Sequence, residues 1–188
     1  LCGILIGVAI SRSRLADALL SPVLTVIKAT PVASFIVLAL LWIERDRLPV
    51  FITLLMVLPI VCSNVAQGIR SVDVSLAEVA KVFHFSRTET LRRLYLPSVA
   101  PYFMAACRSS LGMAWKAGIA AEVLSTPQLG IGTELYFSKT YLETSDLFAW
   151  TLVVILLSMM IEKLLVWGLE CLGRKLRAFP VGGHDACN

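Results

Sequence analysis

The chain has 188 residues, of which 57% are hydrophobic and only 16% are charged, with a formal net charge of +4. Its mean hydropathy is +0.80. A soluble domain of this length cannot bury so much apolar surface, and soluble domains carry about 25% charged residues. The composition therefore excludes an ordinary soluble protein and predicts that lipid covers most apolar side chains. The net charge of +4 is too small to indicate a nucleic-acid partner, and we expect none.

Apolar runs of the length of a membrane span recur along the chain. The first run, residues 1–10, is too short to span, and Arg12 and Arg14 follow it instead of preceding it as in a signal peptide. Because the chain also starts without Met, we interpret this run as the end of a truncated helix. Four complete spans are expected near residues 22–43, 49–69, 98–124 and 147–169. Pro31 and Pro59 predict kinks inside two of them. The expected fold is an all-α, polytopic transmembrane bundle.

Basic residues are divided unequally between the two sides of this bundle. Ten lie in residues 11–21, residues 70–97 and the tail: Arg12, Arg14, Arg70, Lys81, Arg87, Arg92, Arg93, Arg174, Lys175 and Arg177. Three lie in the connections on the other side: Arg45, Arg47 and Lys139. Since cytoplasmic loops are enriched in Lys and Arg, this division predicts that residues 70–97 and the tail from Glu170 are cytoplasmic, with residues 176–188 outside the membrane domain.

The long connection of residues 70–97 is predicted to form two short amphipathic helices. Each begins at a capping box of the S-x-x-E type, Ser75 with Glu78 and Ser86 with Glu89. Apolar residues fall on one face of each helix, at Leu76, Val79, Ala80 and Phe83 in the first and at Leu91, Leu94 and Tyr95 in the second. Such helices either rest on lipid headgroups or bind a groove of another protein, and the residues alone leave both readings open.

The residues of this connection resemble the EAA loop of bacterial ATP-binding-cassette (ABC) importer permeases. That pattern is E-A-A, three residues, Gly, nine residues, then I-x-L-P, and it is matched by Glu78-Val79-Ala80 and by Leu94-Tyr95-Leu96-Pro97 at the same spacing. Val79 replaces the first alanine, and His84 stands at the usual glycine, where we interpret it as a turn or interface residue. Similarity continues at residues 28–31, 112–115 and 120–122, most closely to the nitrate, sulfonate, taurine and thiamine-precursor pyrimidine permeases.

The resemblance implies that residues 1–175 are a type I ABC-transporter membrane domain in the bacterial inner membrane. It implies a second permease copy, two ATPase subunits that hold ATP and Mg, an external solute-binding protein, and no cofactor or metal in this chain. The implied substrate is a small anionic or polar solute. Residues expected at the ATPase dock are Glu78, Val79, Ala80, Phe83, His84, Leu94, Leu96 and Pro97. For Glu78 the alternative is that it is only the capping glutamate of its helix, and the two roles are compatible.

Charged residues inside the expected spans are candidates for the translocation path. Lys116 lies deep in residues 98–124, where a lysine costs about 2.5–3.5 kcal/mol, so it is expected to face protein or water. Arg108 and Gly112 precede it at four-residue steps and share its face, and with Lys28 these cations suggest an anionic solute. Alternatively, Lys28 and Arg108 reach lipid headgroups or form structural ion pairs. Glu122 is a candidate partner of Lys116.

No catalytic motif is present in the sequence. It lacks G-x-x-x-x-G-K-[ST], H-E-x-x-H, paired C-x-x-C and a serine nucleophile elbow, and its five scattered cysteines are interpreted as packing residues. The chain is therefore expected not to be an enzyme, and energy must come from a partner. The alternative function is an ion-coupled carrier or channel whose amphipathic segment lies on the membrane surface.

Overall fold

The computed structural model describes residues 2–73, 75, 78, 82–83 and 85–177. This part of the chain is built from helices in the order α1 (Cys2–Arg12), α2 (Arg14–Ala29), α3 (Val32–Ala39), α4 (Leu48–Arg70), α6 (Arg87–Thr90), the π-helix η1 (Leu91–Tyr95), α7 (Leu96–Ser125), α8 (Ile131–Thr140) and α9 (Thr144–Arg177). The all-α architecture expected from the sequence is confirmed.

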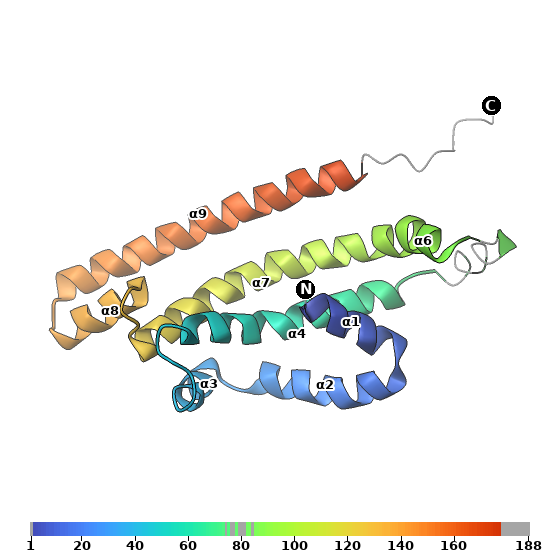
Figure 1. The fold of residues 1–188 in the computed structure, drawn as a ribbon. Coiled ribbons are helices and arrows are strands. Elements are labelled where there is room, and N and C mark those ends of the chain that lie inside the picture. Colours follow the sequence, from blue (N-terminus) through green and yellow to red (C-terminus); the bar gives the residue numbers. More distant parts are fainter. Residues whose placement is uncertain (1, 74, 76–77, 79–81, 84, 178–188) are drawn as a thin grey trace.

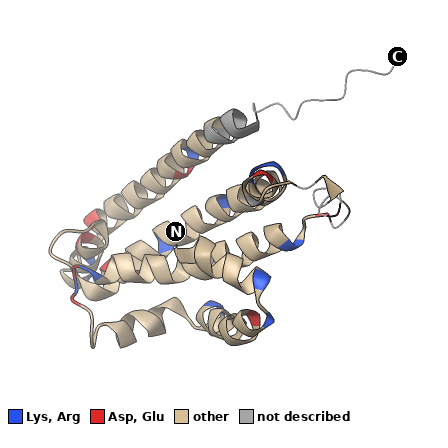
Figure 2. Ribbon diagram, turned by 45° about the vertical axis from the view of Figure 1, so that its right-hand side comes forward, with Lys and Arg blue, Asp and Glu red and all other residues tan. Residues whose placement is uncertain are grey.

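Helices α4 and α7 run antiparallel through the middle of the molecule (Figure 1). α1 and α2 pack on α4, while α9 extends along the other side and contacts α7 and α8. The α1–α2 turn, the C-terminal end of α4, helix α6 and the C-terminal end of α9 lie toward one end of the bundle, which we call the docking end after the predicted dock. α8 and the connection of residues 40–47 lie toward the other, which we call the far end. Charged residues are concentrated near these two ends (Figure 2).

Two small apolar clusters hold the central helices together. Toward the far end, α3, α4 and α7 share a buried cluster of Ile36, Ala39, Leu48, Ile52, Met56, Ala117 and Ala121. Nearer the docking end, α1, α2 and α4 share a second cluster of Ile10, Leu24, Cys62 and Ala66. The α7 contribution is made of small residues, which allow its backbone to approach α4 closely.

Close approach also explains a glycine at the crossing of α1 and α4. A Cβ added at Gly7 would lie 2.9 Å from the carbonyl oxygen of Cys62 and 2.9 Å from Cβ of Val65. Real Cβ atoms do not come so near to backbone oxygen, so any larger residue would separate the two helices.

In the part of the chain that the structure describes, two helices are long and apolar enough to cross a membrane, α4 and the Thr144–Leu169 part of α9. The pair α2 and α3 would add a third span if it is counted as one. α7 has 30 residues and is about 45 Å long, more than the hydrocarbon thickness of a bilayer, but Arg108 and Lys116 interrupt its apolar run. Membrane crossing by α7 stays a prediction.

One expected span, residues 22–43, is wrong as a single helix. α2 and α3 are separated at Thr30 and Pro31 and bent by 101°. Pro31 has no N–H to continue the helix, and it pushes Thr30 into extended backbone with ψ 132. The Thr30 N–H and hydroxyl both donate to the carbonyl of Val26, at 3.0 Å and 2.8 Å, and so close the last turn of α2. The predicted kink at Pro31 is therefore a complete break.

Three other boundaries also differ from the sequence prediction. Residues 11–21, expected as a connection, contain the first turns of α2, because the Ser13 hydroxyl caps it by accepting from the N–H of Ala16 at 3.3 Å. Residues 125–146 contain α8. α6, η1 and α7 follow one another without a break, so the helix expected to start near residue 98 has no start there.

Candidate functional site

The segment that joins α4 to α7, residues 71–95, carries most of the residues predicted to dock a partner, and we call it the docking segment after that prediction. The other two, Leu96 and Pro97, begin α7. Ser75, Glu78 and Val82 are helical, whereas Val79, Ala80 and His84 lie outside the described residues. Several described side chains in and next to the segment are large, apolar and exposed: Val82 at 75%, Phe83 at 70%, Leu91 and Leu96 at 57% each, and Phe85 at 37%. We call these five residues the exposed apolar set. Among the described residues, none of these five belongs to a helix that passes as a membrane span by length and hydropathy, and exposed apolar side chains outside such spans often mark an interaction surface.

The other docking candidates in this segment are less apolar or less exposed. Glu78 and Pro97 are exposed, and Leu94 is half-buried. The ring centroids of Phe83 and Phe85 lie 6.5 Å apart, and the Arg93 guanidinium lies 5.7 Å from the ring centroid of Phe85. These contacts hold the aromatic rings next to a positive charge.

The capping box predicted at Ser86 is confirmed. The Ser86 N–H donates to Glu89 Oε2 at 3.0 Å, and the Glu89 N–H donates to Ser86 Oγ at 3.3 Å. At Ser75 the outcome differs, because the Ser75 N–H donates to Asp73 Oδ1 at 2.9 Å in a local turn. Asp73 therefore takes the place that the prediction gave to Glu78.

The Ser86 cap predicts a dependence on pH. Hydrogen bonds from the Ser86 N–H and then from its hydroxyl lower the pKa of Glu89 below its ordinary value. The stabilisation is complete above the pKa of an unfolded glutamate, about 4.3, and is lost as pH falls through the lower folded pKa. We expect hydrogen-exchange protection factors of residues 86–95 to fall between pH 6 and pH 3. A Glu89→Gln chain with the same fall would contradict this origin.

The π-helix η1 has a local cause. Pro97 has no N–H to donate to the carbonyl four residues earlier, and the Leu96 N–H donates to the carbonyl of Leu91, five residues back. The Ser98 hydroxyl satisfies the carbonyl of Leu94 at 2.8 Å. One wide turn thus connects the docking segment to α7 without ending the helix.

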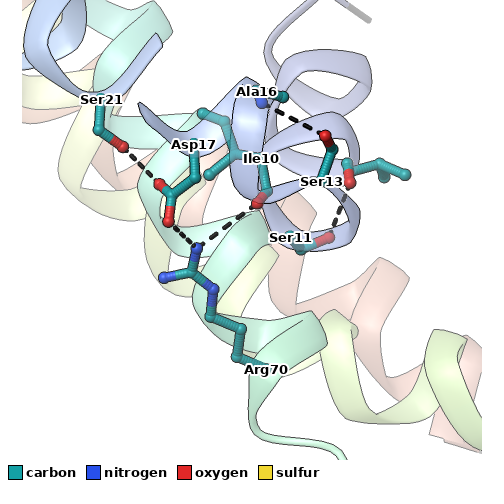
Figure 3. Close-up of polar contacts among 8 residues, drawn as sticks. Ile10, Ser11, Ser13, Ala16, Asp17, Ser21 and Arg70 are labelled. Atoms are coloured by element: carbon teal, nitrogen blue, oxygen red, sulfur yellow. Dashed lines mark hydrogen bonds and ion pairs between the residues drawn. The ribbon is translucent and has the colours of Figure 1, made fainter. Parts of the chain in front are cut away.

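At the N-terminal end of the docking segment, an ion pair holds the last residue of α4 in place (Figure 3). The Arg70 guanidinium donates to Asp17 Oδ2 at 2.8 Å and reaches the carbonyl of Ile10 at 3.5 Å. Ser21 donates to the other oxygen of Asp17 at 2.6 Å. Both groups of the pair are partly exposed, so solvent screens their attraction and the net stabilisation is small. Its structural effect is to attach the end of α4 to the α1–α2 turn, which the sequence did not indicate.

The cations predicted to line a path are not gathered into one site within this chain. Lys28 donates to the Ser63 hydroxyl at 2.7 Å and so joins α2 to α4. Arg108 and Lys116 are exposed on α7, and a Cβ added at Gly112 would meet no atom within 4 Å. The predicted Arg108–Gly112–Lys116 face of α7 is thus open on this chain.

Glu122 has a different role from the predicted pairing with Lys116. Its Oε2 accepts from the N–H of Gly132 at 2.8 Å, in the first turn of α8. Six residues along a helix amount to about 120° around its axis, so Glu122 and Lys116 face different directions. A carboxylate at a helix N-terminus is favourable because it accepts free N–H groups and opposes the positive end of the dipole.

Two buried polar atoms were missed by sequence reasoning. Trp115 Nε1 and Ser125 Oγ have no hydrogen-bond partner in the part of the chain that the structure describes. Unpaired buried polar atoms are uncommon in folded proteins and call for an explanation. Only the polar character of two residues within α7 could have drawn attention to them, and their lack of partners was not visible in the sequence.

Comparison with known proteins gives consistent matches. The model of the family described as binding-protein-dependent transport system inner membrane component matches residues 1–177. The bicarbonate transport system permease protein of Synechococcus elongatus is 22% identical over 88% of this chain and 60% of its own length. A putative aliphatic sulfonates transport permease protein of Bacillus subtilis is 29% identical over 78% and 53%. The taurine transport system permease protein of Escherichia coli is 26% identical over 94% and 62%. The chain thus spans less than two thirds of each relative.

Proposed function

The chain belongs to the family of binding-protein-dependent transport system inner membrane components, and on this basis we propose that it is the membrane-spanning permease subunit of an ABC importer. Its role is to form a solute path and to couple that path to a separate ATPase, where ATP and Mg are bound. A second permease copy and an external solute-binding protein complete the assembly. The chain itself performs no chemistry on the solute.

The exposed apolar set is the observation that carries this proposal. Five large apolar side chains remain uncovered at one end of the bundle, on a segment outside the apolar spans. The segment and the first residues of α7 match the EAA-loop motif at E-x-A and at L-x-L-P. A groove on an ATPase would cover Phe83 and its neighbours, as amphipathic helices are covered in helix-in-groove complexes. The docking end is then cytoplasmic, in agreement with its larger share of basic residues.

Coupling between the ATPase and the bundle follows from how the two ends of the docking segment are attached. Its N-terminal end, next to Arg70, is attached to the α1–α2 turn, and its C-terminal end continues through η1 into α7. Closure of two ATPase subunits would move the docked segments, and each movement would reach both helices. The bundle would then alternate between outward-facing and inward-facing states by rigid-body motion.

The solute class is proposed from the charges on α7. Arg108 and Lys116 lie on a face of α7 that is open in this chain, and a second permease copy would close it into a path. Two cations on this face favour an anionic solute. The relatives named above are permeases for bicarbonate, aliphatic sulfonates and taurine, which are small oxyanions or zwitterions.

Co-purification tests the docking proposal. Phe83→Ser removes an exposed aromatic from the proposed interface, and a buried interface aromatic is typically worth about 2 kcal/mol or more. We expect the affinity for a co-expressed ABC ATPase to fall by about tenfold or more, and ATP-dependent uptake to fall with it.

The matched control is Leu129→Ser, because Leu129 is 94% exposed but lies beyond the other end of α7. This variant should bind the ATPase normally. If Phe83→Ser and Leu129→Ser chains both assemble and transport like the original, the segment does not dock an ATPase. The chain would then be better described as an ion-coupled carrier or channel.

A further inference from the structure

The two apolar clusters of the bundle meet at one level along α4, and a proline lies at that level. Met56 is the last α4 residue in the buried part of the far-end cluster, and Cys62 is the first in the cluster nearer the docking end. Pro59 lies between them in the helix and is fully buried. Because proline has no N–H, the carbonyl of Leu55 cannot receive its usual helical hydrogen bond. The backbone of α4 is therefore weakened where its packing changes from one cluster to the other.

A second interruption lies at the same boundary, at the break between α2 and α3. Leu24 of α2 belongs to the cluster nearer the docking end, whereas Ile36 of α3 belongs to the far-end cluster. The two helices are bent by 101° at Thr30 and Pro31, and α3 turns away from the direction of α2 (Figure 1). Ile27, one turn before the break, packs against the far-end cluster and so lies close to the boundary. In α2–α3 and in α4, the passage from one cluster to the other thus crosses a proline.

Hydrogen bonds connect the two interruptions. Lys28, in the last turn of α2, donates to the Ser63 hydroxyl at 2.7 Å, and the Ser63 hydroxyl donates to the carbonyl of Pro59. Lys28 also lies at the C-terminal end of α2, where the last carbonyls of the helix carry partial negative charge. We call the Lys28–Ser63–Pro59 chain of hydrogen bonds the latch. It fixes the end of α2 against the proline turn of α4.

The latch places a cation at membrane depth. Ser63 lies inside α4, which is long and apolar enough to cross a membrane, so Lys28 lies beside an apolar span. A charged side chain at this depth is unfavourable, and such residues pair within the protein or serve its function. A methionine of similar length would fill the same space, so packing alone does not explain a lysine. A single hydrogen bond to a neutral hydroxyl is easier to break than a buried ion pair, which suits a contact that opens and closes.

The helices on the docking side of these prolines are fixed to one another. The Arg70–Asp17 ion pair attaches the start of α2 to the end of α4, and the cluster nearer the docking end packs α1 and α2 on α4. We call α1, α2 and residues 60–70 of α4 the docking-side group. α3 and residues 48–56 of α4, which pack with the end of α7, are the far-side group. Movement of the docking segment would reach the docking-side group as a unit.

We propose that Pro31 and Pro59 form a hinge between these two groups, and that Lys28 holds the hinge in its present arrangement until the docking segment moves. The hinge rests on the proposed function, because the ATPase supplies that movement, whereas the latch belongs to this chain alone. A rotation of about 15° at Thr30 would displace Leu19, about 16 Å away along α2, by about 4 Å.

Double electron–electron resonance between two spin labels tests the hinge on the full chain in lipid nanodiscs. Labels at Leu19 and Val37, which are exposed on α2 and α3, report across the hinge, and labels at Leu5 and Leu19 report within the docking-side group. Genetically encoded ketone side chains carry the labels, so the native cysteines stay in place. With ATPase subunits bound, trapping with ATP and vanadate should shift the Leu19–Val37 distance by about 4 Å. The Leu5–Leu19 distance should not change.

Lys28→Met tests the latch in the chain alone, without ATPase. Since the hydrogen bond to Ser63 is lost, we expect the Leu19–Val37 distance to lose its single narrow peak. Ser63→Ala removes the same hydrogen bond from the side of α4 and should have the same effect. The control is Lys139→Met, which removes an exposed lysine from α8, outside both groups, and should keep the single peak.

A Leu19–Val37 distance that stays constant under ATP and vanadate, or that changes together with the Leu5–Leu19 distance, would overturn the hinge. A single peak retained in Lys28→Met and in Ser63→Ala would overturn the latch, and reduced uptake by Lys28→Met with that peak retained would assign Lys28 to the solute path instead. If Lys28→Met does not fold, Ser63→Ala decides alone. If no ABC ATPase binds the chain, the proposed function fails, while the comparison of Lys28→Met with Lys139→Met still decides whether the latch exists.

Discussion

A Gly132→Ala chain is expected to lose about 3 kcal/mol or more of folding free energy. The added Cβ would lie 2.5 Å from Cβ of Glu122, 2.8 Å from the backbone N of Val123 and 2.9 Å from the carbonyl oxygen of Ile119. None of these atoms is the end of a flexible side chain, so α8 must move away from α7. Overpacking costs about 1–3 kcal/mol, and separation also weakens the hydrogen bond from Gly132 to the Glu122 carboxylate, worth about 1.5–3 kcal/mol.

The measurement is the midpoint of thermal unfolding in detergent, followed by size-exclusion chromatography after heating. Gly168→Ala is the matched control, because a Cβ there would meet no atom within 4 Å and alanine is the better helix former. We expect Gly168→Ala to leave the midpoint unchanged or to raise it. A Gly132→Ala midpoint equal to that of Gly168→Ala would show that the α7–α8 contact is looser than described.

Lys116→Ala is expected to reduce uptake by about tenfold to a hundredfold without reducing the amount of protein in the membrane. Removal of one charge-assisted hydrogen bond to a solute costs about 1.5–3 kcal/mol. Insertion should not suffer, because a lysine near the centre of a span is itself unfavourable for insertion and alanine is not. Uptake of a labelled anionic solute into proteoliposomes that contain the full assembly is the test.

Two further variants distinguish a solute contact from a general effect of charge. Lys116→Arg keeps the positive charge and should retain part of the uptake. Lys163→Ala removes a lysine from the apolar helix α9, outside the predicted Arg108–Gly112–Lys116 face, and should transport normally. Normal uptake by Lys116→Ala would remove Lys116 from the translocation path.

The helices that were predicted well have continuous apolar runs and recognisable ends. α4 was expected at residues 49–69 and is found at Leu48–Arg70. The cap at Ser86 was visible because its partner Glu89 lies three residues along the same chain, and the structure confirms both hydrogen bonds. A capping box depends only on residues three positions apart in the chain, so it can be predicted from sequence.

Most of the features that were missed depend on contacts between different helices, which the sequence does not show directly. Hydropathy is continuous across Thr30 and Pro31, so it gave no measure of the 101° bend. α8 lacks an apolar run and is held by contacts with α7 and α9. Glu122 was considered as a candidate partner of Lys116, whereas in the structure its carboxylate accepts from the backbone N–H of Gly132, ten residues later. A contact with the backbone of a later turn cannot be predicted from the residue types alone. For the docking segment, the proposed ATPase partner comes from the family resemblance, and the structure adds the exposed apolar side chains.

The continuity of η1 with α7 has a geometric consequence. α7 alone is about 45 Å of uninterrupted helix, and its two ends are the docking segment and the α8 corner fixed by Glu122. A continuous helix of this kind changes its length very little, so we expect a displacement of the docking segment to appear at the far end mainly as a tilt. The distance between the two ends therefore stays nearly constant while their inclination to the membrane changes. A pair of spin labels near the two ends of α7 should report the same separation in every nucleotide state.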